Sequence, residues 1–221
     1  MKPPRLICVV TDRRRLSPGS SHAESLQLLV EFVSAAAAAG ADLIQLRERD
    51  LDARELAALT KACLERAEGR ARIVVNDRVD VAIAAGAQGV HLRSDSIDPV
   101  NTRRLAPPSF LIGRSVHEVP EAVAVSRRAV DYLIFGTTFP TGSKPEGAPV
   151  SGLGPLTEAC AGASVPVLAI GGITLDRVPA VIQAGASGVA AIGLFIPPAG
   201  VPLPQHLTET INSLRRTLTP S

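Results

Sequence analysis

Eight short apolar runs, separated by segments long enough for a helix, are the feature of this 221-residue sequence that most constrains its fold. The runs are almost continuously apolar and do not alternate with polar residues, which is typical of parallel strands buried on both faces. We therefore expect each run to form one strand of a parallel sheet. The eight runs are residues 6–10, 43–46, 73–75, 89–92, 110–112, 132–135, 165–170 and 188–192.

The segments between these runs carry helical patterns. Residues 22–39 and 51–68 have apolar side chains at three- and four-residue spacing, which predicts amphipathic helices. Residues 78–85 and 175–184 predict shorter helices, and Pro120 lies near the start of another, where proline is tolerated. Strands and helices therefore alternate along the chain.

A glycine followed by alanine recurs between a helix and the next strand, at Gly40, Gly86 and Gly185. Glycine there supplies the left-handed backbone that ends a helix. Eight strand–helix units without a break in composition predict an α/β fold, a single-domain (β/α)8 TIM barrel over residues 1–221. The rival is an open doubly wound sheet, but such sheets usually carry a glycine-rich motif after the first strand, and residues 11–16 contain no glycine.

Composition and charge argue against several classes of function. The net charge of +2 lacks the strong basic excess of most nucleic-acid-binding domains, so we expect no nucleic-acid partner. The three cysteines, Cys8, Cys63 and Cys160, show no metal-ligand spacing, and their odd number indicates free thiols in a reducing compartment. The first residues are too few for a signal peptide, and the alanine run at 35–39 is too short to span a membrane. We expect a cytoplasmic protein with no membrane partner.

In a barrel of this kind the active site lies at the carboxyl ends of the strands. Gln45, Arg47 and Arg49 follow one another at alternate positions after the second run, so they share one side of the strand. Two guanidinium groups and an amide on one side suit an anion, because guanidinium matches phosphate oxygens in bidentate fashion. A solvated charged loop is the alternative interpretation.

Other strand ends carry similar residues. Asp77, after the third run, is placed to bind a hard cation or to cap the next helix. Residues 141–144 (TGSK) can wrap a phosphate or form an ordinary turn. Gly172 and Gly193, after the last two runs, let backbone N–H groups reach a phosphate. Several anion-binding loops around one cavity predict ligands with more than one phosphate and a metal that neutralises them.

Six segments occur in a distinctive order along the chain: 45–48 (QLRE), 76–80 (NDRVD), 89–92 (GVHL), 115–117 (SVH), Pro140-Thr141 with Lys144, and 169–173 (AIGGI). This series resembles the thiamine phosphate synthase and TenI family, over most of the chain from Val10 to about Phe195. The resemblance implies a transferase that joins hydroxymethylpyrimidine diphosphate to thiazole phosphate and releases diphosphate.

The resemblance also implies a role for each site residue. It makes Ser115 and Lys144 the catalytic residues and Asp77 the ligand of Mg²⁺, the expected cofactor. Arg49 stands where the synthase usually has lysine, so the charge is kept. The implied diphosphate ligands are Gln45, Arg47, Arg49, Asn76 and Lys144, and the implied thiazole phosphate ligands are Thr141, Ser143, Gly172 and Gly193, with Ile192 beside them.

Two departures separate the chain from the synthase pattern. Ser96 stands where the synthase has a second metal-binding aspartate, and the adjacent Asp95 would face the other way on a strand-like backbone. Residues 113–117 are more like TenI, which in some bacteria is a thiazole tautomerase. That enzyme uses a histidine at the position of Thr137, and threonine is a poor acid or base near neutral pH.

Three hypotheses follow. The leading one is a Mg²⁺-dependent thiamine phosphate synthase acting on small phosphorylated substrates. The second is a TenI-like tautomerase that needs neither a pyrimidine nor a metal. The third is a non-catalytic barrel that binds thiazole phosphate or thiamine phosphate, motivated by Ser96 and Gly193. The sequence leaves the oligomeric state open, a homo-oligomer included.

Overall fold

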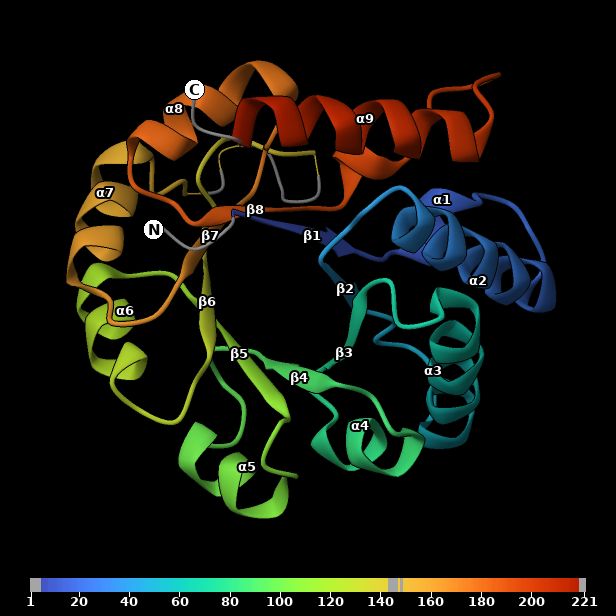
Figure 1. Ribbon diagram of the computed structural model, residues 1–221, viewed down its shortest axis with the longest axis horizontal. Helices are drawn as coiled ribbons and strands as arrows, with labels where there is room; N and C mark the ends of the chain where they lie inside the picture. The colour runs from blue at the N-terminus through green and yellow to red at the C-terminus, as the bar shows by residue number, and fades with distance from the viewer. Residues whose placement is uncertain (1–4, 143–146, 148, 219–221) are drawn as a thin grey trace.

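The computed structural model describes residues 5–142, 147 and 149–218. Eight parallel strands follow one another in sequence order and β8 pairs with β1, which closes the barrel seen in Figure 1. The predicted (β/α)8 fold is therefore confirmed. The strands are β1 (Leu6–Val10), β2 (Leu43–Leu46), β3 (Arg72–Asn76), β4 (Gly89–Leu92), β5 (Leu111–Val116), β6 (Tyr132–Phe135), β7 (Val167–Ile170) and β8 (Gly188–Ala191).

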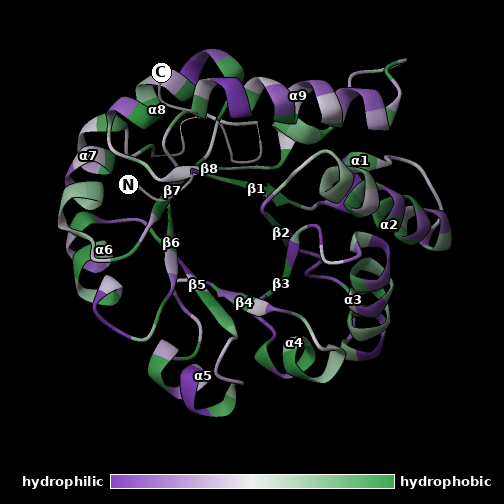
Figure 2. Ribbon diagram, in the orientation of Figure 1, coloured by the Kyte–Doolittle hydropathy of each residue, from purple (hydrophilic) through white to green (hydrophobic). Residues whose placement is uncertain are grey.

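Helices surround the barrel and cover the outer face of the strands (Figure 1). Figure 2 shows mainly hydrophobic strands and helices that carry both hydrophilic and hydrophobic residues. The helices are α1 (Arg13–Leu16), α2 (His22–Ala38), α3 (Ala53–Ala67), α4 (Val79–Ala85), α5 (Pro99–Leu105), α6 (Val119–Ser126), α7 (Leu153–Gly162), α8 (Val178–Gln183) and α9 (Leu203–Leu218), with 3-10 turns η1 (Leu175–Arg177) and η2 (Gly193–Phe195).

The strands bury side chains on both faces, which explains their continuous apolar runs. In β1, Ile7 and Val9 join the large core between strands and helices, whereas Cys8 and Val10 join a smaller cluster inside the barrel. Successive side chains of a strand point to opposite faces, so each apolar residue finds a buried environment.

Local signals at the helix ends place the loops. Ser21 and Glu24 form a capping box at the start of α2, in which each side chain bonds the other residue's backbone N–H. Asp52 and Glu55 do the same for α3. Gly86 ends α4 in the left-handed conformation, with φ of 77°, as its place between helix and strand predicted.

Some predicted boundaries were wrong for identifiable reasons. The predicted strand 110–112 extends to Val116, because polar residues near its carboxyl end still pair with β6. The predicted helix 175–184 is divided into η1 and α8. Pro179 explains the division, because its ring has no N–H and would clash with the carbonyl of residue 175 in a continuous α-helix.

Within residues 5–142, 147 and 149–218, no helix combines the length and apolar character needed to cross a membrane.

Candidate active site

A cavity of about 770 Å³ is formed by residues at and beyond the carboxyl ends of the strands. It contains most of the side chains that the sequence singled out, although they come from loops far apart in the chain. Ser143 and Lys144 lie outside the described residues. The predicted residues that line the cavity are Gln45, Arg47, Arg49, Asn76, Ser115, Thr141, Gly172, Ile192 and Gly193.

The cavity wall is rich in arginine. Among the described residues, Arg15, Arg47, Arg49, Arg93 and Arg177 line it. Burial lowers the pKa of Arg47, and the neighbouring Arg49 lowers it further, so the two guanidinium groups repel each other in the absence of an anion. A multiply charged anion in the cavity would relieve this repulsion.

Three of these arginines had not been selected from the sequence. Arg15 lies in the four-residue helix α1, which was not predicted, and Arg177 lies in the turn η1, within the predicted helix 175–184. Arg93 stood in the run after the fourth strand, but nothing in its spacing distinguished it from a surface arginine. Only the closure of the barrel brings these side chains to one cavity.

Two amide side chains meet at the floor of the cavity. Gln45 from β2 donates from Nε2 to the Oδ1 atom of Asn76 from β3, at 3.1 Å, and is only 3% exposed. This bond leaves the amide oxygen of Gln45 and the amide nitrogen of Asn76 for a ligand. The pair can therefore both accept from and donate to a bound molecule.

Asp77 does not cap the next helix. The N-cap position of α4 is Arg78, whose side chain makes no capping bond, and Asp77 has left-handed backbone with φ of 64°. The carboxylate of Asp77 instead accepts a short hydrogen bond from the Ser96 hydroxyl and lies 3.7 Å from the Arg93 guanidinium. The capping alternative is therefore wrong, and the carboxylate is held beside the cavity wall.

Asp95 points away from the proposed metal position, as the sequence predicted, but a strand-like backbone is not the reason. Asp95 is exposed and pairs with Arg93, whereas Ser96 faces Asp77. The backbone there is not strand-like: it forms a turn in which the Ser96 N–H donates to the Arg93 carbonyl at 3.2 Å. The turn points the hydroxyl, and not the neighbouring carboxylate, at Asp77.

Mg²⁺ fits the residues around Asp77 only with help from a ligand. No group of three histidine, cysteine, aspartate or glutamate side chains that could hold a metal occurs within the described part of the chain. Asp77 and Ser96 offer hard oxygen atoms, and Mg²⁺ is often held by one or two carboxylates together with substrate phosphates and water. These residues suit a cation that arrives with a phosphorylated substrate.

A buried polar chain leads from the barrel interior to the cavity. The Tyr132 hydroxyl lies 3.2 Å from His91 Nδ1, and His91 Nε2 lies 2.9 Å from the Ser115 hydroxyl. Burial lowers the pKa of His91 to about 3, so its imidazole is neutral near pH 7. Gly113 makes room for the chain, since a Cβ there would lie 2.6 Å from His91 Nδ1.

The loops after β6 and β7 are in close contact at the far side of the cavity. Gly172 has φ of 61°, and a Cβ there would overlap the Pro140 carbonyl. Arg177 donates to the Gly172 carbonyl at 2.7 Å, and Thr141 lines the cavity beside them. Thr137 also lines the cavity, at the position where the tautomerase would require an acid or base.

A closed (β/α)8 barrel with a cationic cavity at the carboxyl ends of its strands defines a class of proteins, the barrel enzymes that bind phosphorylated small molecules. The sequence matches a family described as thiamine monophosphate synthase over residues 9–195, most of the chain. The chain belongs to this family.

Individual proteins that are similar to this chain support the same family assignment. A thiamine-phosphate synthase from Methanoculleus marisnigri is 44% identical over 189 residues, which cover 85% of this chain and 86% of the relative. A thiamine-phosphate synthase from Roseiflexus castenholzii is 41% identical over 208 residues, covering 93% and 86%. The solved structure of a thiamine phosphate pyrophosphorylase from Pyrococcus furiosus is 31% identical, with a TM-score of 0.81 and 97% of each chain covered.

Proposed function

We propose that this protein is a thiamine phosphate synthase, a transferase that couples hydroxymethylpyrimidine diphosphate to thiazole phosphate and releases diphosphate. The observation that carries the proposal is the group formed by Gln45, Arg47, Asn76 and Asp77. These residues come from the ends of β2 and β3. Gln45, Arg47 and Asn76 line one wall of a cavity in a barrel of this family, and Asp77 lies beside that wall, 3.7 Å from the cavity-lining Arg93.

The residues fit the chemistry of the leaving group. Diphosphate departs from a benzylic-type carbon whose positive charge the electron-rich aminopyrimidine stabilises, so negative charge grows on the diphosphate. Arg47 and Arg49 would stabilise that charge, because fixed cations need little reorganisation during the reaction. Mg²⁺ held by Asp77 with the Ser96 hydroxyl would neutralise the diphosphate further.

The opposite wall fits the second substrate. Thr141, Gly172 and Gly193, with Ile192 beside them, would hold the thiazole phosphate and thereby place the thiazole nitrogen against the reacting carbon. Ser115, at the cavity end of the buried polar chain, would donate a hydrogen bond to the reacting groups. The proposed roles of Ser143 and Lys144 rest on the family resemblance alone.

The tautomerase alternative has less support. Thr137 supplies no acid or base near neutral pH at the position where the tautomerase uses a histidine. A non-catalytic binder is the second candidate, because Ser96 contacts Asp77 where a second carboxylate would stand, and the described residues hold no group of three metal-binding side chains. Relatives named thiamine-phosphate synthase also support our proposal of a cytoplasmic protein acting on small phosphorylated substrates.

The decisive experiment supplies purified protein with both substrates and Mg²⁺ and detects thiamine phosphate by mass spectrometry. Arg47→Ala should lower the rate by about a hundredfold, the usual cost of removing one preorganised donor from a developing anion. Arg104→Ala, an exposed arginine on α5, is the matched control and should leave the rate unchanged. Binding of thiamine phosphate without any turnover would instead select the non-catalytic binder.

A further inference from the structure

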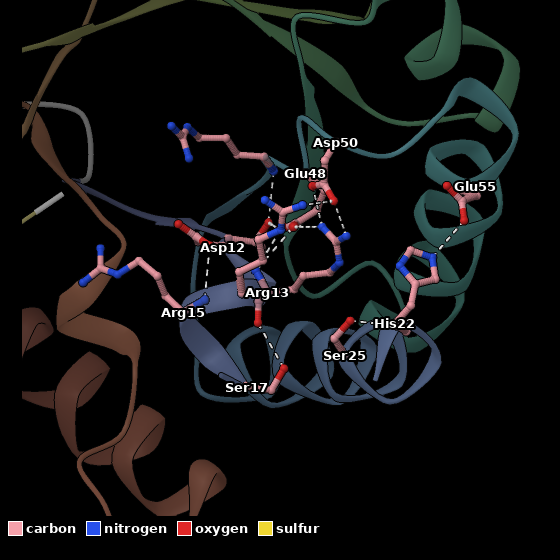
Figure 3. A network of polar contacts seen from close by, with 12 residues as sticks. Asp12, Arg13, Arg15, Ser17, His22, Ser25, Glu48, Asp50 and Glu55 are labelled. Carbon is pink, nitrogen blue, oxygen red and sulfur yellow. Dashed lines mark hydrogen bonds and ion pairs between the residues drawn. The ribbon is translucent and has the colours of Figure 1, made fainter. Parts of the chain in front are cut away.

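A network of charged side chains lies behind the arginines of the cavity, where the loops after β1 and β2 meet (Figure 3). Arg47 and Arg49 face the cavity, and the residues that alternate with them, Glu48 and Asp50, turn to Arg13. Glu48 is 4% exposed and Arg13 is 3% exposed, and their closest charged atoms lie 3.0 Å apart. The Arg-Glu-Arg-Asp order therefore separates cations on one side from anions on the other.

Hydrogen bonds join Arg13 to both carboxylates of the network. Arg13 donates to the Glu48 and Asp50 carboxylates at once, and its backbone N–H also points at Glu48. Arg13 holds the pKa of Asp50 well below its usual range, and the two carboxylates raise the pKa of Arg13. A buried ion pair of this kind adds little stability compared with apolar packing, so stability alone does not account for it.

One hydroxyl connects the network to the cavity. Thr11 donates its hydroxyl proton to Glu48 Oε1 at 2.6 Å, so its oxygen is left to accept a hydrogen bond. It accepts one from the backbone N–H of Arg47 at 3.0 Å. The Thr11 N–H donates in turn to the Gln45 carbonyl at 2.9 Å. The ends of β1 and β2 are therefore tied together at the residue that presents a guanidinium group to the cavity.

Arg47 needs such a restraint. Burial lowers the pKa of Arg47 and the charge of Arg49 lowers it further, so the two guanidinium groups repel each other where they line the cavity together. A carboxylate behind the segment, acting through the Thr11 hydroxyl, can hold the Arg47 backbone against this repulsion without entering the cavity and competing for the ligand.

We propose that Thr11, Glu48 and Arg13 are positioning residues, which hold the backbone of Arg47 so that its side chain is preorganised for a diphosphate group. This inference rests on the proposed function, since it assigns the anion that Arg47 binds. Thr11 is the residue that transmits the effect, because it alone touches both the buried carboxylate and the Arg47 backbone among the described residues.

Thr11→Val tests the proposal, because valine keeps the shape of threonine and removes only the hydroxyl. The matched control is Thr60→Val, at another fully buried threonine, whose hydroxyl bonds the Leu56 carbonyl within α3 and does not line the cavity. Inorganic diphosphate with Mg²⁺ is the probe, and calorimetry gives its dissociation constant. We expect about a tenfold weaker affinity for Thr11→Val, the equivalent of about one hydrogen bond, and no change for Thr60→Val.

A double-mutant cycle distinguishes positioning from general damage. With Arg47→Ala already present, Thr11→Val should change the affinity by less than about twofold, because its effect passes through Arg47. Thr11→Ser, which restores the hydroxyl, should recover wild-type affinity. Thr11→Ala with Thr60→Ala as its control replaces the valine pair if Thr11→Val does not fold.

Equal losses at positions 11 and 60, or an undiminished loss in the Arg47→Ala background, would overturn the inference. The proposed function is tested separately by product formation in the unmodified protein. Wild-type protein that binds diphosphate and makes thiamine phosphate, with Thr11→Val equal to wild type in affinity, would refute the positioning role alone. Wild-type protein that makes no product but shows the predicted pattern of diphosphate affinities would refute the synthase and retain the positioning role.

Discussion

The imidazole of His91 has a hydrogen-bonding neighbour at each ring nitrogen, and these neighbours decide where its proton lies. Within the described part of the chain, the Tyr132 hydroxyl has His91 Nδ1 as its hydrogen-bond partner and is otherwise packed among apolar side chains. A buried hydroxyl is best satisfied when it donates, so Nδ1 accepts and the neutral ring carries its proton on Nε2. Nε2 then donates to Ser115, whose own proton is directed to the cavity.

Nitrogen NMR can test this assignment directly. With ¹⁵N-labelled histidine, the signal from His91 should show a protonated Nε2 and an unprotonated Nδ1 near pH 7. The chain has only 4 histidines, so loss of one signal set in a His91→Gln variant assigns it. A proton on Nδ1 would mean that Ser115 donates to the ring and cannot donate to a substrate.

The same burial makes stability depend on pH. The pKa of His91 is about 3 in the folded protein against 6.5 ordinarily, so below about pH 6.5 the unfolded chain binds a proton that the folded chain does not. The free energy of unfolding should therefore fall as the pH drops from about 6.5 to about 3, by at most about 1.4 kcal/mol per pH unit from this group. Urea unfolding of wild type and His91→Gln should show a smaller pH slope for the variant; identical slopes would contradict the neutral histidine.

Ser96 should determine how strongly the protein depends on Mg²⁺. Ser96 donates to Asp77 where a second carboxylate would add a ligand. Ser96→Asp should lower the Mg²⁺ concentration needed for half-maximal rate, because a second carboxylate oxygen strengthens the site. Asp95→Ala is the matched control, since Asp95 points to Arg93 and should leave the metal dependence unaltered. If Asp95→Ala instead raises the Mg²⁺ concentration needed for half-maximal rate, Asp95 is a metal ligand and the turn rearranges when the metal binds.

At the scale of the elements, the eight strands could be predicted because most strand side chains in this barrel are buried on one face or the other. The prediction failed where strands end in polar residues. Gly113 to Ser115 belong to β5, although the sequence predicted a loop after residue 112. They are not apolar because Gly113 leaves room for His91 and Ser115 faces the cavity. The residues that build the site are thus the same ones that obscure the end of the strand.

The helices differ in how much their own sequence determines. The capping boxes of α2 and α3 are local, so four adjacent residues specify where each helix begins. Helix α1 has only four residues, too few for a periodic pattern, and Arg13 within it pairs with Glu48 and Asp50 from the loop after β2. Arg15 was missed for this reason, and Arg177 because nothing in the predicted helix 175–184 marked it as a site residue. Gln45, in contrast, was found on a strand with a clear apolar pattern, and Asn76 through the family resemblance.

Capping provides a prediction at this scale. Ser21→Ala removes the side chain that accepts from the Glu24 N–H and should lower the free energy of unfolding by about 1 kcal/mol. Synthase activity should not change, because Ser21 does not line the cavity. Urea denaturation measures the first effect and a rate assay the second. Ser20→Ala, one residue earlier and exposed, should be neutral in both.

At the scale of the whole molecule, the barrel brings side chains from most of its loops to one end. The chain carries 23 basic and 21 acidic side chains, so its overall charge is small. Closure of the barrel nevertheless gathers five arginines of the described residues around one cavity, while Glu48 and Asp50 turn away from it. Charge is therefore separated within a nearly neutral molecule.

That separation has a consequence for how fast substrates arrive. A concentrated positive field at the mouth of a cavity steers diffusing anions toward it, and dissolved ions weaken such a field over about 10 Å at 0.1 M ionic strength. Raising the ionic strength should therefore lower kcat/KM for hydroxymethylpyrimidine diphosphate while leaving kcat nearly constant. Stopped-flow or steady-state kinetics measure both quantities. A kcat/KM independent of salt would mean that encounter does not limit the reaction. The arginines would then stabilise only the bound substrate, and the rate would be the same at low and at high ionic strength.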